Sequence, residues 1–245
     1  MNSKRWNVNN SQLQRPETMK EYLKGAKIST GLQIKLPDQP YTTRIELLEK
    51  LSSAKKIIHV GFTDHKDIIL TKIKGNVWLH KRLMDVSERC IGIDINCEAV
   101  EFVRNELGIG DIYCLDIMSD GLPHDLKNTK WDSIILGEVL EHIDNPVLFL
   151  KNLKDKVSSS VEKIILTVPN AFRYANFDFA LKGKEVINSD HRYWFTPYTI
   201  MKILTMAEIE IENVYMVETY HNSENYEITA KNPILRDDIV ISGKF

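Results

Sequence analysis

The sequence predicts an α/β protein with a doubly wound, mostly parallel sheet of seven strands that ends in a C-terminal antiparallel hairpin. Short β-branched runs alternate with amphipathic helical segments from Ile57 to Val168, which is typical of parallel strands joined by helices on both sheet faces. The first run stops at a glycine, Gly61, and the second reaches an acid, Asp94. The length of 245 residues is enough for one such domain with additions.

Each strand is predicted from a short apolar run bounded by polar or turn-forming residues. Five parallel strands are expected near residues 56–60, 90–95, 111–115, 132–136 and 163–168. Two more, near 209–218 and 225–231, are expected to form the hairpin, because a polar turn separates them.

Helices are predicted where apolar residues recur at helical spacing behind a capping residue. The expected helices are 17–25, a segment capped by Thr42 or Thr43, 97–107, 146–156 and a segment opened by Thr196-Pro197. Pro146 fits the first turn of its helix, with Asp144 or Asn145 as the cap.

Three parts of the chain are expected. Residues 1–41 form a polar extension and linker, and residues 42–231 form the α/β domain. This domain contains an insertion at 72–83 and a long aromatic-rich loop at 169–195, which a compact domain usually keeps for function. Residues 232–245 are an unassigned tail, in which Ile239-Val240-Ile241 is able to pair on a sheet edge.

Composition narrows the function. The 32 Lys and Arg residues nearly balance the 34 Asp and Glu residues, which argues against a general nucleic-acid binder. The three cysteines, Cys90, Cys97 and Cys114, show no Cys-x-x-Cys spacing. They are expected to be buried thiols in a reducing compartment. No run approaches the roughly 20 apolar residues of a membrane span, so a cytoplasmic protein is expected.

A strand ending in glycine, a helix and a strand ending in a carboxylate form the core of a nucleotide-binding βαβ unit. Gly61 allows close backbone approach, and Asp94 is able to bind a ribose diol. Thr63 and His65 stand where a fuller fingerprint has further glycines. The glycine signal alone therefore does not identify the ligand.

The order of these features resembles that of class I S-adenosylmethionine-dependent methyltransferases. The resemblance covers about residues 42–231 and rests on four stretches: Gly61, Asp94, Leu115-Asp116-Ile117 and Trp131–Ile143. Its most diagnostic part is Gly-Glu-Val-Leu-Glu-His-Ile at 137–143. Ile164–Asn170 is similar to the family's fifth strand and exit loop, and the family's Rossmann-like sheet also has seven strands.

The resemblance implies S-adenosylmethionine as cofactor. Gly61 would pass under its methionine moiety, and Asp94 would bind its ribose hydroxyls, with Ile95 packing on the adenine. Asp116 would accept a hydrogen bond from the adenine amino group, with Ile117 beside the ring.

Two further cofactor residues follow from the same resemblance. Leu136 and Gly137 would lie near the amino-acid end of the cofactor. All the implied residues sit at the C-terminal ends of strands, where open α/β sheets bind ligands.

The chain also departs from the family pattern. The family prefers an acid at the position of His59 and glycines at those of Thr63 and His65. About 33 residues separate Gly61 from Asp94, against roughly 20 in dinucleotide-binding units, so residues 72–83 are an insertion. Its cations either hold an acidic or phosphorylated substrate or form a solvated basic face around one packed tryptophan, and the second interpretation is favoured.

Glu138, Glu141 and His142 have i, i+3 and i+4 spacing, so a helix would put them on one face. Together with His191 they are similar to the metal set of small-RNA 2′-O-methyltransferases. The same pattern occurs in methyltransferases with no demonstrated metal, so a divalent metal is possible but not the favoured interpretation. His142 and His191 are otherwise the candidate catalytic bases, or they fix the loop.

The resulting hypothesis is methyl transfer to an oxygen or nitrogen of a small polar acceptor, with no membrane partner and with nucleic acid disfavoured by the charge balance. Three alternatives remain. They are a metal-dependent RNA-terminal 2′-O-methyltransferase, a dinucleotide oxidoreductase, and a non-catalytic binding or scaffold protein on the same sheet. The oxidoreductase is disfavoured because the glycine fingerprint is poor and the Glu-Val-Leu-Glu-His stretch has no role there.

Overall fold

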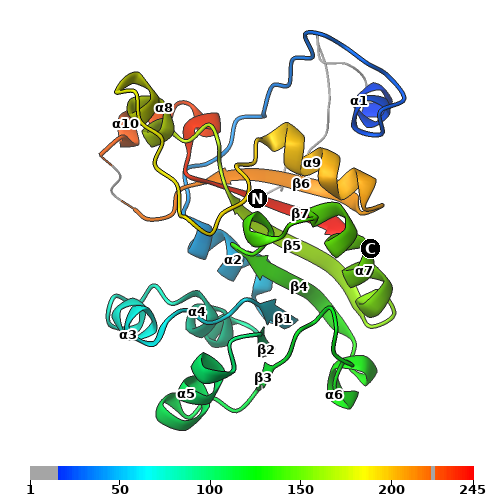
Figure 1. Cartoon of the computed structure of the whole chain (residues 1–245), viewed down its shortest axis with the longest axis vertical. Helices are drawn as coiled ribbons and strands as arrows, with labels where there is room; N and C mark the ends of the chain where they lie inside the picture. Colours follow the sequence, from blue (N-terminus) through cyan, green and yellow to red (C-terminus); the bar gives the residue numbers. More distant parts are fainter. Residues whose placement is uncertain (1–15, 222–223) are drawn as a thin grey trace.

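A computed structural model describes residues 16–221 and 224–245 (Figure 1). One seven-stranded sheet has the order β3-β2-β1-β4-β5-β7-β6. The strands are β1 (Lys56–Val60), β2 (Arg89–Asp94), β3 (Ile112–Cys114), β4 (Trp131–Gly137), β5 (Val161–Pro169), β6 (Glu210–Val217) and β7 (Asp238–Lys244). Strands β1 to β5 run parallel, and β7 pairs antiparallel with both β5 and β6. The predicted fold class is confirmed, and the strand order reverses between β1 and β4, where doubly wound sheets bind ligands.

The second strand of the predicted hairpin is wrong. Residues 225–231 contain the short helix α10 (Tyr226–Thr229), and the seventh strand is β7. Because β7 has a neighbour on each side, it needs the continuous apolar run Ile239-Val240-Ile241, whose side chains are fully buried. The predicted domain boundary at residue 231 therefore leaves out a strand of the sheet.

The remaining helices connect the strands and cover both faces. They are α1 (Pro16–Leu23), α2 (Arg44–Ser52), α3 (Lys66–Lys74), α4 (Leu79–Val86), α5 (Cys97–Leu107), α6 (His124–Asn128), α7 (Pro146–Val157), α8 (Tyr174–Leu181) and α9 (Pro197–Met206), with 3₁₀-helices η1 (Leu140–His142) and η2 (Pro233–Leu235). The predicted caps at Thr43, Asn145 and Thr196 are confirmed, since each side chain accepts a backbone hydrogen bond from its helix. No helix in the described ranges is long and apolar enough to cross a membrane.

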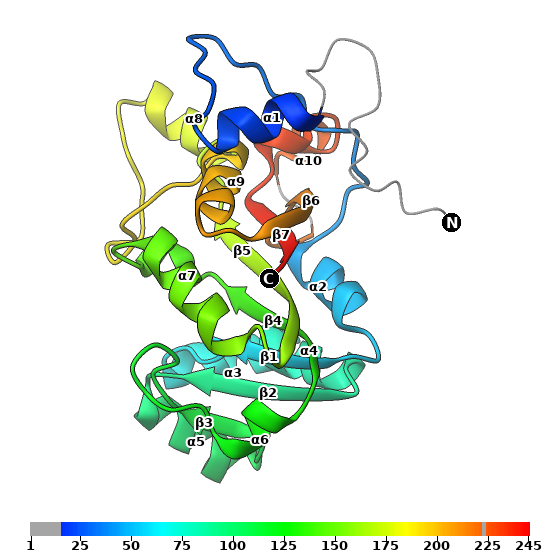
Figure 2. The same ribbon diagram turned by 90° about the vertical axis from the view of Figure 1, so that its right-hand side faces the viewer.

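The two sheet faces carry separate hydrophobic clusters. Figure 2 shows α7 and α9 on one side of β5 and β7 and α2 on the other. One cluster packs the α7 and α9 side chains, including Leu150 and Leu204, against Ile134 and Ile164. The other packs Leu48 of α2 and Leu83 of α4 against strand residues on the opposite face. Successive strand residues point to opposite faces, so β-branched residues at adjacent positions fill both clusters.

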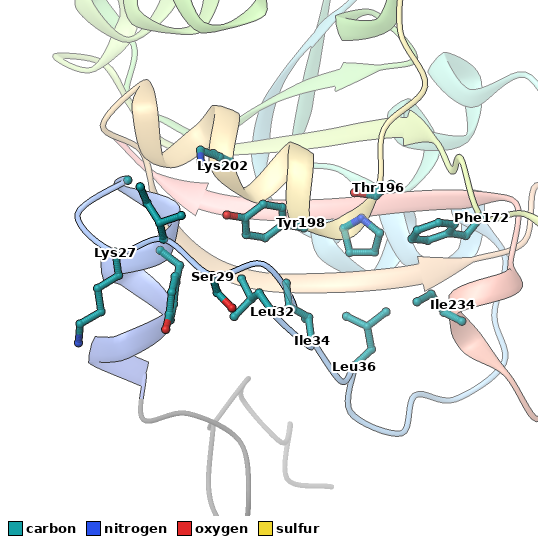
Figure 3. Close-up of a pocket in the computed structure, with 14 residues that line it drawn as sticks. Lys27, Ser29, Leu32, Ile34, Leu36, Phe172, Thr196, Tyr198, Lys202 and Ile234 are labelled. Atoms are coloured by element: carbon teal, nitrogen blue, oxygen red, sulfur yellow. The ribbon is translucent and has the colours of Figure 1, made fainter.

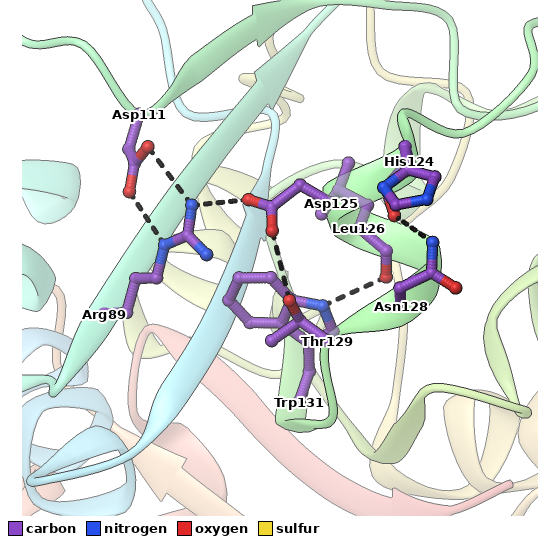
Figure 4. A network of polar contacts seen from close by, with 8 residues as sticks. All are labelled: Arg89, Asp111, His124, Asp125, Leu126, Asn128, Thr129 and Trp131. Carbon is purple, nitrogen blue, oxygen red and sulfur yellow. Dashed lines mark hydrogen bonds and ion pairs between the residues drawn. The ribbon is translucent and has the colours of Figure 1, made fainter.

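A polar network closes the edge of the sheet opposite the C-terminal ends of the parallel strands (Figure 4). Arg89, the first residue of β2, pairs with Asp111 at 2.9 Å and with Asp125 at 2.6 Å. Trp131, the first residue of β4, donates its indole N–H to the Leu126 carbonyl at 3.1 Å. This network tethers α6 beneath the sheet and lies away from Asp94, which is at the other end of β2.

The insertion at 72–83 comprises the end of α3, a turn and the start of α4. Three of its four cations are paired: Lys72 with Asp64 at 2.7 Å, Arg82 with Glu49 at 2.6 Å, and Lys81 with Asp85. Trp78 is buried. These contacts support the interpretation as a solvated charged face around a packed tryptophan.

His80 of α4 contacts His59 of β1, the residue that stands where the family prefers an acid. His80 and His59 are both buried, with their Nδ1 atoms 3.3 Å apart. The Nε2 atom of each ring is buried without a hydrogen-bond partner in the described part of the chain. Burial lowers the pKa of both imidazoles, that of His80 to about 3, so the rings are neutral at neutral pH.

Acidification is therefore expected to destabilise the fold through this pair. Below pH 6.5 the unfolded chain protonates His80 whereas the folded protein does not, so stability is complete above pH 6.5 and is lost as the pH falls towards 3. Between pH 7 and pH 5 the loss from His80 alone is about 2 kcal/mol. Urea unfolding at both pH values, compared with His80→Phe, isolates this loss. An equally steep pH dependence in the variant would contradict the assignment.

Candidate functional site

The predicted cofactor residues at β1 and β2 meet at the C-terminal edge of the sheet. Gly61 has a φ of +72°, a left-handed conformation that glycine adopts without strain. The Asp94 carboxylate accepts hydrogen bonds from Thr63 N at 3.0 Å and from Asn96 N at 2.9 Å. Asp94 therefore holds the turn after β1 against the start of α5, and the turn needs no further glycine at residue 63.

The predicted adenine-side residues differ in exposure. Ile95 is 74% exposed, an apolar surface beside Asp94, whereas Ile117 is buried in the core. The Asp116 carboxylate accepts hydrogen bonds from Met118 N at 2.8 Å and from Ser119 Oγ at 2.7 Å. These hydrogen bonds lower the pKa of Asp116. Its predicted contact with adenine stays a prediction.

Close packing surrounds the two glycines at the expected methionine end. A Cβ atom placed on Gly61 would lie 2.5 Å from Cγ2 of Val139, and one placed on Gly137 would lie 3.4 Å from His59 Nε2. Leu136 is buried in the strand, so its backbone rather than its side chain is at the edge. The His59 side chain thus lies close to the Gly137 backbone, a contact that the sequence did not reveal.

The prediction that a helix places Glu138, Glu141 and His142 on one face is wrong, because Glu138 lies outside the helical turn. β4 ends at Gly137, Glu138 takes a left-handed φ of +57°, and only Leu140–His142 are helical, as the single turn η1. The turn nevertheless places Glu141 and His142 beside His191 from the loop before α9. One ligand atom from each of these three residues lies within 4.8 Å of the other two.

The carboxylate of this trio is buried without compensation. Glu141 is fully buried, and both its oxygens lack a partner among the described residues. Burial, followed by repulsion from Glu138, raises the pKa of Glu141 to about 9. Burying an unpaired carboxylate is costly, and proteins usually pair such a group with a cation.

The two imidazoles are arranged around that carboxylate. Their rings meet edge to face, with centroids 4.7 Å apart. His142 Nδ1 lies 3.1 Å from Asp190 Oδ2, so it donates to this carboxylate and keeps the Nε2 lone pair free. His191 Nδ1 is buried without a partner within the described chain, and burial followed by the proximity of His142 lowers its pKa.

These side chains fit a divalent cation. A carboxylate without a hydrogen-bond partner and two imidazoles are ligands that first-row transition-metal ions accept. The contact between His142 and Asp190 is the usual outer support of a metal-bound histidine. The fit rests on the orphaned atoms and on the contact at His142.

Glu138 belongs to a neighbouring network instead. Its Oε1 accepts a hydrogen bond from Thr167 Oγ1 at 2.8 Å and pairs with Arg44 Nη1 at 2.9 Å. Asp238 of β7 lies 3.9 Å from the same guanidinium nitrogen. Sequence reasoning missed Arg44 and Asp238, because each reads locally as an ordinary helix start or strand start.

The predicted substrate-side loop at 169–195 contains α8 and is tied to the site. Arg192 N donates to the Glu141 carbonyl at 2.8 Å, and Tyr193 Oη donates to the Asp144 carbonyl at 2.7 Å. These bonds place His191, which directly precedes them, over η1. The position of His191 therefore follows from contacts that the next two residues, Arg192 and Tyr193, make with the turn at 141–144.

A separate pocket of about 440 Å³ lies between residues 22–36 and α9 (Figure 3). Its wall is largely apolar, with Leu32, Ile34 and Leu36 facing Phe172 and Tyr198. It shares no lining residue with the Glu141, His142 and His191 trio.

The prediction of three buried thiols is wrong for two of the cysteines. Cys90 is a buried free thiol, whereas Cys97 and Cys114 are exposed and joined by a disulfide. Cys114 lies beside Asp94 in the parallel register, and Cys97 opens α5, so their Cα atoms are 5.0 Å apart, within the range of a disulfide. The bridge joins the two strand ends that carry the predicted ribose and adenine residues.

Comparisons with known proteins agree with the predicted fold. A methyltransferase domain family profile matches residues 74–159, from the end of α3 to just beyond α7. No curated protein sequence matches the chain.

Among solved structures, the fold is similar to that of the small RNA methyltransferase HEN1. The TM-score is 0.55, the identity is 16%, and the match covers 88% of this chain and 27% of that one. The chain thus spans about a quarter of HEN1.

Two smaller structures match over most of their length. A SAM-dependent methyltransferase from Aquifex aeolicus has a TM-score of 0.50 and 15% identity, with 92% of this chain and 97% of that one covered. A putative methyltransferase from Haloferax volcanii, in complex with the Trm112 methyltransferase activator, has a TM-score of 0.52 and 12% identity, with 81% and 87% covered. At these identities the similarity establishes a shared fold.

Proposed function

We propose that the chain is a class I S-adenosylmethionine-dependent methyltransferase that methylates an oxygen or nitrogen of a small polar acceptor, and that a hydroxyl oxygen is the better match. The methyltransferase domain profile over residues 74–159 and the shared fold support this proposal. The observation that supports a hydroxyl is the Glu141, His142 and His191 trio at the exit of β4. Amine acceptors carry their own lone pair once neutral. A hydroxyl must lose a proton, and this trio offers the groups for that task.

The residues at the C-terminal edge of the sheet would each bind a different part of the cofactor. Asp94 and Gly61 would bind the ribose and the methionine moiety of the cofactor, with Asp116 on the adenine side and Gly137 at the amino-acid end. The sulfonium of S-adenosylmethionine already carries a good leaving group. The protein therefore contributes mainly alignment of the acceptor oxygen with the methyl group.

Glu141, His142 and His191 would hold a divalent cation. Such an ion would bind the acceptor hydroxyl and lower its pKa. Asp190 keeps the Nε2 lone pair of His142 available, and burial keeps His191 neutral. The buried Glu141 balances the positive charge that would otherwise be enclosed at the site.

A second candidate is methylation of the 2′-hydroxyl at an RNA terminus. The trio, whose residues are able to hold a metal ion, and the fold similarity to HEN1 support it. The nearly balanced charge argues against it, because RNA binding usually requires a basic surface. Both candidates use the same hydroxyl chemistry and differ in the acceptor.

Chelation is the direct test of the metal-dependent function. Dialysis against EDTA is expected to lower methyl transfer from labelled S-adenosylmethionine at least about 100-fold, and Mn²⁺ or Mg²⁺ should restore it. The acceptors compared are a panel of small hydroxyl and amine compounds and a short RNA with either a 2′-hydroxyl or a 2′-deoxy end.

Transfer to small hydroxyl compounds supports the first candidate, and transfer only to the 2′-hydroxyl end supports the second. Full activity in EDTA would contradict a metal-dependent site and leave the two histidines as bases. Calorimetry that detects no binding of S-adenosylmethionine would contradict both candidates and favour a non-catalytic protein.

A further inference from the structure

Glu138, the second residue of the diagnostic motif at 137–143, has an unusual backbone conformation. Its φ of +57° lies in the left-handed region, which residues with a side chain seldom adopt. Such a conformation persists where the surroundings hold it in place. The contacts of the Glu138 side chain therefore show what fixes this turn.

Two side chains from other elements hold the Glu138 carboxylate. Thr167 of β5 donates to Oε1 at 2.8 Å, and the same hydroxyl accepts a hydrogen bond from Glu138 N at 3.1 Å. Arg44 Nη1 lies 2.9 Å from Oε1. The Arg44 side chain is only 15% exposed, so this ion pair is shielded from water.

Arg44 is itself fixed before it reaches Glu138. It is the first residue of α2, directly after the Thr43 cap, and its backbone N–H donates to the Glu218 carbonyl at 2.8 Å. Its guanidinium also faces Asp238, whose carboxylate accepts a hydrogen bond from Thr219 Oγ1 at 2.9 Å. Arg44 thus joins α2, the exit of β4 and the start of β7.

The contacts of the Glu138 side chain decide whether Glu138 belongs to the candidate ligand set formed by the neighbouring trio. Glu141, His142 and His191 bring their ligand atoms within 4.8 Å of one another, and Glu138 is not part of this group. The Glu138 carboxylate is held at Oε1 by a guanidinium and a hydroxyl, whereas neither Glu141 oxygen has a hydrogen-bond partner among the described residues. The two glutamates of the motif therefore have different roles.

We propose that Arg44 is a positioning residue that keeps Glu138 out of the ligand set, so that the cation site has three protein ligands, Glu141, His142 and His191. This inference rests on the proposed metal-dependent function. It differs from the four-ligand arrangement that the motif alone suggests. Three protein ligands leave coordination positions open for the acceptor hydroxyl.

Mn²⁺ binding to the full chain with bound S-adenosylhomocysteine, measured by calorimetry, tests the assignment without any acceptor. Glu141→Gln is expected to weaken Mn²⁺ at least about 100-fold, whereas Glu138→Gln should change it by less than about 5-fold. Arg44→Gln is expected to tighten Mn²⁺ about 3- to 10-fold, because it leaves the Glu138 charge uncompensated beside the site. Arg44→Gln should also lower kcat at least about 10-fold. Arg44→Lys should restore much of the wild-type Mn²⁺ affinity and of the wild-type kcat.

A purely structural role for Arg44 predicts weaker Mn²⁺ binding in Arg44→Gln, so the sign of the change discriminates. If Arg44→Gln does not fold, Thr167→Val loosens Glu138 from the other side and should tighten Mn²⁺ about 2- to 3-fold. Loss of Mn²⁺ binding in Glu138→Gln as severe as in Glu141→Gln would overturn the inference and leave the proposed function intact. A wild-type protein that binds no Mn²⁺ would overturn both.

Discussion

Glu141→Gln is expected to abolish metal-dependent methyl transfer and, in metal-free protein, to raise stability. The activity loss should be at least about 100-fold, because the substitution removes the only carboxylate of the trio. The gain arises because the wild-type carboxyl is fully buried with both oxygens unpaired in the described structure. Function and stability are thus expected to change in opposite directions.

The gain in stability should depend on pH. Burial raises the pKa of Glu141 to about 9, so above pH 4.5 the unfolded chain releases a proton that the folded protein retains. Wild-type stability from this group is therefore complete below pH 4.5 and declines as the pH rises towards 9. Glutamine does not titrate, so its stability relative to wild type should rise by about 4 kcal/mol between pH 5 and pH 8.

Thermal and urea unfolding in EDTA at pH 5 and pH 8 measure this effect, and the methyl-transfer assay measures the loss of activity. Glu106→Gln, an exposed acid on α5, is the matched control and should change neither property. A Glu141→Gln variant that is less stable than wild type at pH 8, or that keeps metal-dependent activity, would contradict the assignment.

Asp94→Ala is expected to weaken S-adenosylmethionine binding at least about 100-fold. Two charge-assisted hydrogen bonds to a ribose diol contribute about 3 kcal/mol together, which corresponds to that factor. The substitution also frees Thr63 N and Asn96 N, which Asp94 now binds. The turn after β1 would then lose its tie to β2 at the point where the cofactor is expected.

Calorimetry with S-adenosylmethionine and S-adenosylhomocysteine measures this loss. Glu101→Ala removes one acid from the exposed side of α5 and serves as the control for net charge. Asp94→Asn keeps the size of the side chain and should bind with intermediate affinity. Binding within about 5-fold of wild type in Asp94→Ala would remove Asp94 from the cofactor site.

Most of the fold was predictable, because strands buried on both faces read as continuous β-branched runs. Ile57-Ile58 and Ile134-Ile135 show this directly, since adjacent residues enter different clusters. β7 was missed although its apolar run was noted. The chain makes α10 and η2 before it returns between β5 and β6, and sequence periodicity does not report strand order.

The candidate site was only partly predictable for the same reason. Glu141, His142 and His191 were found because their residue types carry the chemistry and two of them share a short motif. Arg44 and Asp238 matter only through the packing of α2 and β7 against the exit of β4. Cys97 and Cys114 are 17 residues apart, a spacing that carries no motif, so only the register of two parallel strands reveals their pairing.

The position of β7 determines when the sheet of a nascent chain is able to assemble. In the described structure β6 pairs only with β7, and β7 follows every other strand in the sequence. Until residues 238–244 leave the ribosome, β6 has no partner and β5 presents an open edge, which is a surface prone to aggregation. Asp238, which faces Arg44, arrives in that same segment. Closure of the sheet and completion of the charge network beside Glu138 therefore depend on the same segment, which is synthesised after the other six strands.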